Sequence, residues 1–260
     1  MTTVRLSDLT AGIPPTQLVY LSDSYQRKCK SQVLKIAQEK KKRIYLILDQ
    51  TIFHPKGGGQ PSDQGILQSV SCRINVRKAM FGKGIVIHYG KILQGTIDNN
   101  LLIGEIDWLR RYEFMKRHTA GHLLDHCLTY VTGTPVITTD SWLGDECYVG
   151  YQGKAPSDRQ LEQAVQMANE WIHKGRPVIL ETVSAQELLR RAPDAPNMYR
   201  LPDLEAYRIV TIKGCTAIPC AGTHLRNIRE IDRVAVSKIE QRNHTFRVYY
   251  DVYREKREIK

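Results

Sequence analysis

The hydrophobic pattern changes character near Trp108, and this change constrains the fold more than any other feature of the sequence. Before this point, short apolar runs of strand length alternate with segments rich in turn-forming residues. After it, apolar residues recur at helical spacing, with strand-like runs in between. We therefore predict an α+β protein. A small β-barrel-like domain would cover residues 1–108, and an α+β domain with a mainly antiparallel sheet would cover residues 109–260.

Three apolar runs in the first half have the length of strands: 45–49, 84–88 and 101–107. Between the first two lies a segment dense in glycine and proline, Phe53-His-Pro-Lys-Gly-Gly-Gly-Gln-Pro-Ser-Asp-Gln-Gly65, which predicts a loop. The basic run from Lys28 to Arg43 is interpreted as a solvated hairpin or as an edge that faces phosphates. Short strands separated by turns favour a small barrel or a sandwich.

The second half carries helix start and stop signals. A helix is predicted from Tyr112 to Val131, where Gly133 would end it. Ser157 with Gln160 has the spacing of a capping box, and Gly175 would end the helix that follows. The same capping pattern recurs before a short helix over 185–191. Strands are predicted at 147–152, 178–182, 207–212, 234–239 and 246–252.

Composition restricts the partners and the compartment. The 38 Lys and Arg outnumber the 27 Asp and Glu, and the net charge of +11 favours a polyanionic partner such as nucleic acid. No window of about 18 apolar residues predicts a membrane span, and the N-terminus lacks the pattern of a signal peptide. We therefore expect a cytoplasmic, reducing compartment, in which the six cysteines would be free thiols or metal ligands.

Four residues have the spacing of a metal site. His118 and His122 lie four apart on the predicted helix, so both imidazoles would share one face. Cys220 and His224 lie four apart in a glycine-containing turn. Three imidazoles and one thiolate favour Zn²⁺ over Mg²⁺ or Ca²⁺. His126, one turn further along the helix, is predicted to be structural, and the other cysteines are predicted to be packing residues.

Two common zinc enzymes do not fit this pattern. The thermolysin-type helix requires a glutamate directly after the first histidine, where this chain has Thr119. The zinc deaminase signature requires His-x-Glu with a downstream Cys-x-x-Cys, which the sequence lacks.

Three motifs together resemble one known family. Arg117-His-Thr-Ala-Gly-His-Leu-Leu124 and Pro219-Cys-Ala-Gly-Thr-His-Leu225 are similar to the two zinc motifs of alanyl-tRNA synthetase editing domains. The segment 53–65 resembles the glycine-rich motif of their preceding barrel. In this order and at this length, the motifs resemble the freestanding AlaX family in its medium-length form, over residues 45–250. The chain departs from the family pattern at His54, usually tyrosine, and at Ala221, usually glycine.

The resemblance implies zinc-dependent hydrolysis of mischarged tRNA(Ala), chiefly Ser-tRNA(Ala) and sometimes Gly-tRNA(Ala), by a protein acting in trans. It implies that His118, His122, Cys220 and His224 are the zinc ligands. Zinc could activate water or hold the substrate, and His224 could be a permanent ligand or a displaceable one that assists the reaction. Gln60 would orient water or substrate, or would be a solvated turn residue.

Rejection of alanine requires a group that recognises the serine hydroxyl. Thr119, Thr139 and Ser141 are the candidates, and Thr139 is preferred because we expect it on a polar turn beyond the zinc helix. Asp63 is expected to cap the glycine-rich turn. Basic residues near the two zinc motifs could hold the acceptor phosphates of the tRNA, or each could belong to a solvated surface: Arg110, Arg111, Lys116, Arg117, Lys213, Arg226 and Arg229.

Two other functions fit the same residues. A closed zinc site could stabilise a non-catalytic module that binds tRNA or another RNA, and access of water to the metal would distinguish it. The chain could also be a zinc hydrolase of another acyl ester. In that case the substrate would not require a polynucleotide for affinity.

Overall fold

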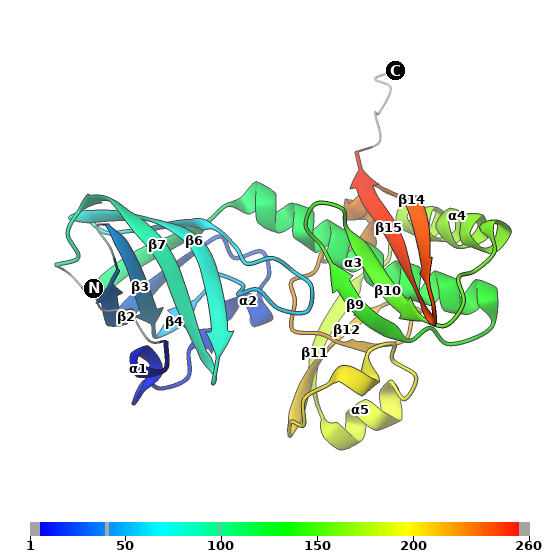
Figure 1. The fold of residues 1–260 in the computed structure, drawn as a ribbon, viewed down its shortest axis with the longest axis horizontal. Helices are drawn as coiled ribbons and strands as arrows, with labels where there is room; N and C mark the ends of the chain where they lie inside the picture. The colour runs from blue at the N-terminus through cyan, green and yellow to red at the C-terminus, as the bar shows by residue number, and fades with distance from the viewer. Residues whose placement is uncertain (1–5, 40–41, 99, 255–260) are drawn as a thin grey trace. The chain divides into compact units, whose positions relative to one another are not determined.

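A closed antiparallel barrel of six strands forms the first part of the chain (Figure 1). The computed structural model describes residues 6–39, 42–98 and 100–254. The strand order is β2-β3-β7-β6-β5-β8, and every neighbouring pair is antiparallel. Closure leaves no free sheet edge. The strands are β2 (Lys28–Gln38), β3 (Arg43–Leu48), β5 (Gly65–Gln68), β6 (Cys72–Gly82), β7 (Ile85–Gly95) and β8 (Leu101–Ile106).

Strand β3 is buried on both faces, which explains its continuous apolar run. Leu46 and Leu48 belong to the core inside the barrel. Ile47 points to the opposite face and joins a second cluster with Leu9 of helix α1 (Leu6–Thr10). The remaining small elements of this part are α2 (Val19–Ser22) and the parallel pair of β1 (Gln17–Leu18) with β4 (Gln50–Thr51).

The structure confirms strands at all three apolar runs predicted in the first half. The basic run also forms the predicted hairpin, since β2 and β3 pair antiparallel, although Lys40 and Lys41 lie outside the described residues. The full length of β6 and the second half of β7 were not predicted. The pairing of these strands shifts register after Arg73 and after Val76. The apolar residues of β6 alternate with polar ones from Cys72 to Arg77, and the alternation is lost at Lys78, next to the second shift.

A buried ion pair joins the end of the glycine-rich segment to the start of helix α3 (Trp108–Thr132). Arg111 is 0% exposed and Asp63 is 1% exposed. The Arg111 Nε donates to Asp63 Oδ1 at 2.9 Å, and the guanidinium also donates to the backbone oxygens of Ser24 and Ile52. The His54 N–H donates to Asp63 Oδ2 at 2.6 Å, so the predicted capping role of Asp63 is confirmed. The prediction that Arg111 contacts phosphate is wrong, because its donors are used inside the protein.

The second part of the chain combines two antiparallel sheets with helices. The chain forms two compact units. The described residues of 1–57 and 61–112 belong to one unit, and those of 58–60 and 113–260 belong to the other. One sheet has the order β14-β15-β10-β9 and the other β11-β12-β13. The strands are β9 (Thr138–Trp142), β10 (Tyr148–Gln152), β11 (Val178–Ser184), β12 (Ala206–Ile212), β13 (Ile218–Pro219), β14 (Arg233–Arg242) and β15 (Thr245–Tyr253). The α+β class with a barrel and a mainly antiparallel sheet is therefore confirmed.

The structure confirms the start and stop signals predicted for the helices in this part of the chain. Helix α4 (Asp158–Lys174) begins at Ser157, whose capping box with Gln160 is complete, and ends at Gly175. Helix α5 (Ala185–Arg191) begins at Ser184, which accepts a hydrogen bond from the Glu187 N–H. Helix α3 ends before Gly133, which has a φ of +70°. Two short 3₁₀ helices cover Met198–Arg200 and Ile228–Ile231. No helix within the described residues is long and apolar enough to cross a membrane.

Strand β9 was not predicted. It pairs with β10, placing Ser141 opposite Val149 and Asp140 opposite Gly150. The prediction that Thr139 lies on a polar turn is therefore wrong. The strand sequence Thr-Thr-Asp-Ser-Trp contains no aliphatic residue, so it lacks the apolar alternation from which strands are predicted.

We predict that stability falls in mild acid because of His88, which is 0% exposed inside the barrel. Its Nε2 lies 2.8 Å from Thr51 Oγ1, and burial lowers its pKa from 6.5 to about 4. Between these values the unfolded chain binds a proton that the folded chain does not. The stabilisation is thus complete above pH 6.5 and is lost by about 1.4 kcal/mol per unit as the pH falls toward 4. Urea unfolding at about pH 7 and about pH 5 should show a smaller acid loss for His88→Gln than for the wild type, and equal losses would contradict this assignment.

Candidate metal centre

Four nitrogen and sulfur side chains converge in the second unit. His118 and His122 lie on α3, and Cys220 and His224 lie in the turn after β13. One donor atom from each residue lies within 4.8 Å of the others. The Cys220 Sγ lies 3.4 Å from the Nε2 of both His118 and His224. The structure thus brings together the four residues whose spacing predicted a metal site.

The turn that carries Cys220 can approach α3 because it has no side chain at Gly222. A Cβ added there would lie 2.2 Å from the His118 ring. Arg208 on β12 holds the turn from the other side: its Nη1 donates to the backbone oxygens of Cys220 at 2.7 Å and of Gly222 at 3.0 Å. The Cys220 N–H in turn donates to the Arg208 oxygen. The geometry of the site therefore depends on a glycine and on an arginine clamp.

The cluster has the dimensions of a site for a metal ion. In a tetrahedral zinc site, nitrogen and sulfur ligands lie about 3.6 Å apart, close to the two separations of 3.4 Å. The His122 Nδ1 is buried and has no hydrogen-bond partner among the described residues. Burial lowers the pKa of His122 to about 3, with a further contribution from Arg208, so this imidazole stays neutral and retains a lone pair for a metal. The four residues can therefore hold a metal ion.

Gln60 orients one of the imidazoles. Its Oε1 accepts from the Thr223 N–H at 3.1 Å and lies 3.1 Å from His118 Nδ1, while its Nε2 donates to Thr223 Oγ1. Because Oε1 can only accept, His118 Nδ1 carries the proton, and its Nε2 faces Cys220 with a free lone pair. The alternative that Gln60 is a solvated turn residue is wrong, because it is 0% exposed.

The glycine loop before Gln60 lies against β9. Gly59 has a φ of +81°, and a Cβ at this position would lie 2.3 Å from Ser141 Oγ. The Leu143 N–H donates to the Gly59 oxygen, and the Ser141 hydroxyl donates to the Gly58 oxygen. Glycine is therefore required here both for the backbone conformation and for the close approach.

Thr119 orients a second imidazole. Its Oγ1 lies 3.2 Å from His224 Nδ1 and accepts from the Leu225 N–H at 3.1 Å. Thr119 is 0% exposed. Thr119 is one of the residues expected to recognise a substrate hydroxyl, but its own hydroxyl holds the turn 220–224 through His224 and Leu225. Thr139, in contrast, is exposed on β9, and its hydroxyl donates to Asp140 Oδ1 at 3.2 Å.

Contacts outside the four clustered residues decide several predictions about individual residues. Lys116 pairs with Asp232 at 2.8 Å, and Arg117 pairs with Asp251 at 2.9 Å, so the prediction that these two cations contact phosphate is wrong. His126 packs against Trp171 with ring centroids 4.9 Å apart, in agreement with a structural role. Lys213, Arg226 and Arg229 are exposed. Free thiols buried in the protein, as predicted, are Cys29, Cys72, Cys127 and Cys147.

Sequence reasoning missed two charged residues near the cluster. Arg208 lies inside a strand, and nothing in its local sequence indicates that it contacts the turn of Cys220. Asp125, three residues after His122, is buried and accepts a hydrogen bond from the Tyr151 hydroxyl at 2.7 Å. Burial raises the pKa of Asp125 to about 7, although Tyr151 and Arg200 act in the opposite direction.

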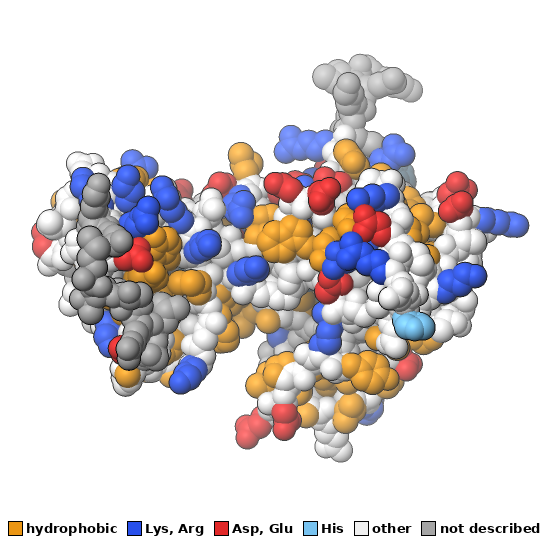
Figure 2. All heavy atoms as spheres, viewed as in Figure 1, with side chains coloured by type: hydrophobic (Ala, Val, Ile, Leu, Met, Phe, Trp, Pro, Cys, Tyr) orange, Lys and Arg blue, Asp and Glu red, His pale blue; other side chains and the backbone are white. Residues whose placement is uncertain are grey.

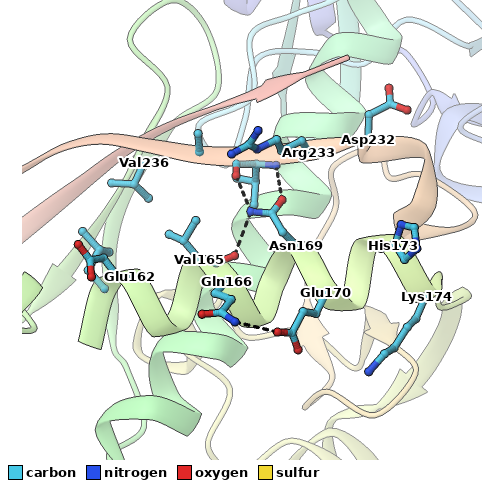
Figure 3. Close-up of a pocket in the computed structure, with 13 residues that line it drawn as sticks. Glu162, Val165, Gln166, Asn169, Glu170, His173, Lys174, Asp232, Arg233 and Val236 are labelled. Carbon is cyan, nitrogen blue, oxygen red and sulfur yellow. Dashed lines mark hydrogen bonds between the residues drawn. The ribbon is translucent and has the colours of Figure 1, made fainter. Parts of the chain in front are cut away.

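A groove of about 800 Å³ lies elsewhere in this unit, between α4 and β14 (Figure 3). Its lining consists of residues 161–174 of α4 and 232–236 around the start of β14, so the four clustered residues do not contribute to it. Asn169 bridges its floor: its side-chain amide exchanges two hydrogen bonds of 2.9 Å with the backbone of Val234. The amide thus provides hydrogen-bond partners for the backbone of β14, which lies at the edge of its sheet. The four clustered residues, and not the groove, are therefore the candidate functional site.

Comparison with known proteins identifies the family of this chain. The family model of class II (A) tRNA synthetases matches residues 18–110. The alanyl-tRNA editing protein AlaX-M of Methanosarcina barkeri is 30% identical over 246 residues, covering 90% of this chain and 98% of that protein. The chain belongs to the AlaX-M family. The AlaX-M protein of Methanosarcina acetivorans is also 30% identical. The alanine–tRNA ligase of Sulfurisphaera tokodaii is 27% identical, and the match covers 26% of that ligase.

We predict that Thr119→Val weakens the centre without removing a metal donor. The change leaves His224 Nδ1 and the Leu225 N–H without their partner, so the free energy of unfolding should fall by about 1–3 kcal/mol. Metal affinity should fall about 10- to 100-fold, as is typical when a hydrogen bond to a ligating imidazole is lost. Competition with a coloured chelator measures the affinity. Thr119→Ser, which keeps the hydroxyl, is the control, and a valine variant with unchanged affinity would exclude the positioning role.

Proposed function

We propose that this AlaX-M protein hydrolyses the ester of mischarged tRNA(Ala), chiefly Ser-tRNA(Ala) and also Gly-tRNA(Ala), at a zinc site formed by His118, His122, Cys220 and His224. The observation that carries the proposal is the convergence of these four donors in a protein of this family. The two Methanosarcina relatives are alanyl-tRNA editing proteins. Matches to AlaX-M proteins extend over nearly their whole length, which favours action on tRNA that another enzyme has charged.

Zinc is the metal that this donor set favours. One thiolate and three imidazoles are borderline-soft ligands that suit zinc, whereas magnesium and calcium prefer oxygen. When bound, zinc would supply a Lewis acid that polarises an ester carbonyl or lowers the pKa of water.

The protein itself would contribute orientation. Gln60 fixes the tautomer of His118, and Thr119 holds His224 through its Nδ1. Arg208 fixes the backbone around Cys220 and places a positive charge beside its thiol, which opposes the rise of the Cys220 pKa that burial causes. We propose that His224 acts at the reacting ester and that Gln60 supports the reaction by orienting His118.

Selectivity would depend on a polar group near this centre. We propose Thr139 for this role: it lies on β9, two residues before Ser141, whose hydroxyl contacts the glycine loop. Its exposed hydroxyl could exchange its bond to Asp140 for one to the serine side chain of the substrate. A site with such a partner loses this hydrogen bond when alanine binds, because alanine has no hydroxyl.

The first test concerns the metal. The purified protein should contain about one zinc per chain, and Cys220→Ala should lose most of the zinc and most of the deacylation activity. Elemental analysis measures the zinc content. Cys127→Ala, which removes a buried thiol outside the cluster, is the matched control and should retain its zinc. Full zinc occupancy in Cys220→Ala would exclude this ligand set.

The second test concerns the reaction. Ser-tRNA(Ala) should be deacylated about 10² times faster than Ala-tRNA(Ala), and Gly-tRNA(Ala) should lie between them, since glycine fits by size but lacks the hydroxyl. Thr139→Val should narrow the difference between serine and alanine at normal zinc content. Rates are measured by loss of labelled amino acid from each tRNA. Equal rates on Ser- and Ala-tRNA(Ala) in the wild type would exclude editing.

A structural zinc site is the second candidate, because four protein donors are typical of closed sites. In that case the zinc-loaded protein would bind tRNA but deacylate none of the three substrates. A hydrolase of a different acyl ester would cleave small esters equally well with and without an attached polynucleotide. Assaying both kinds of ester with the same zinc-loaded preparation distinguishes the three functions.

A further inference from the structure

The positive charge of the protein is concentrated in the barrel unit. Residues 1–57 and 61–112 contain 17 Lys and Arg against 8 Asp and Glu, a net charge of +9. The remaining residues contain 21 against 19, a net charge of +2. The unit that contains the four clustered residues is therefore nearly neutral. The positive charge that would attract a polyanion lies mainly in the barrel unit.

Part of this charge is aligned on the outer face of three neighbouring strands. Arg43 on β3 lies opposite Lys91 on β7, and in the next row Tyr45 lies opposite Tyr89, which lies opposite Lys78 on β6. Directly paired residues project to the same side of a sheet. The three cations are exposed and the two tyrosines are half-buried. Blue side chains are prominent over this part of the barrel, where β6 and β7 face the reader (Figures 1 and 2).

The two tyrosine rings are held in place. Their centroids lie 5.0 Å apart, and the hydroxyls of Tyr45 and Tyr89 both donate to the carboxylate of Glu39, at 3.4 and 3.2 Å. Glu39 is thus occupied by the tyrosines. The three cations form no ion pair with any residue in the described part of the chain, in contrast to Lys116 and Arg117 of the other unit. Their charges remain available to an external anion.

We infer that this surface, the β3–β7–β6 face, binds the phosphate backbone of an RNA strand or stem. Arg43, Lys91 and Lys78 would contact phosphates, and the fixed tyrosine pair, whose rings are inclined by 40° to each other, would offer aromatic contacts to a ribose or a base. The inference rests on the proposed function for the identity of the RNA as tRNA. The face would hold the body of the tRNA, which is a role separate from ester hydrolysis.

The test compares two variants that lose the same charge. Arg43→Ala/Lys91→Ala removes two cations of the face, and Lys154→Ala/Arg159→Ala removes two exposed cations of the other unit. Fluorescence anisotropy with uncharged tRNA(Ala) measures binding by the full zinc-loaded chain between about 50 and 300 mM salt. We expect the barrel variant to bind at least about 10-fold more weakly at the lowest salt. Its slope of log affinity against log salt should fall by about 1.4–1.8, whereas the control should change less than about 2-fold in affinity.

If both variants lose the same tRNA affinity, net charge alone explains the loss and the inference is overturned. A barrel variant that binds tRNA like the wild type would also overturn it. Because binding is measured without hydrolysis, failure of the proposed reaction is recognised separately: the wild type would then bind tRNA and leave Ser-tRNA(Ala) intact. As a second measurement, the barrel variant should show a raised KM and an unchanged kcat on Ser-tRNA(Ala). Circular dichroism and a thermal melt verify that both variants fold.

Discussion

The close packing of the turn 220–224 against one face of α3 is the constraint on which the centre depends. Gly222 permits the approach because any side chain there would overlap the His118 ring. Once the turn is in place, hydrogen bonds fix the imidazoles: Gln60 orients His118 and Thr119 orients His224. The carboxamide oxygen of Gln60 can only accept, so the His118 Nε2 lone pair is directed at the thiol of Cys220, while the Nε2 of His224 lies 3.4 Å from the same sulfur. These hydrogen bonds restrict the two imidazoles before any metal binds, which reduces the entropy cost of forming the site.

The two units contribute different physical properties. The unit with the four clustered residues has a nearly balanced charge, and carboxylates of the same unit neutralise the buried Lys116 and the partly buried Arg117. The barrel carries the excess of positive charge on exposed strand residues and buries a different kind of ion pair, Arg111 with Asp63. That pair is fully desolvated, and the further acceptors of Arg111 offset the cost of burying its charge. Its role is to fix the start of α3 relative to the glycine-rich segment within the barrel unit.

Local signals in the sequence were sufficient for much of the fold. The capping residues Ser157 and Ser184 predicted helix starts because a cap needs only neighbours within three residues. Strand β9 has no aliphatic residue and therefore gives no signal in the sequence, whereas β6 alternates only over its first half, from Cys72 to Arg77. The error for Thr139 followed from the missed strand. Arg111, Lys116 and Arg117 were misread as phosphate contacts because their carboxylate partners lie 48, 116 and 134 positions away.

The sequence by itself determined the fold class, the four clustered residues and the family, because each depends on residue types at short, fixed spacing. His118 with His122, and Cys220 with His224, are pairs that a helix turn or a tight loop brings together without the rest of the chain. Only the tertiary structure decided which polar groups serve these residues. The partners that give roles to Thr119, Gln60 and Arg208 lie on other elements of the chain. The alignment of the cations on β3 and β7 follows from the register of the barrel strands. Burial and strand pairing are properties of the whole fold, and no local pattern encodes them.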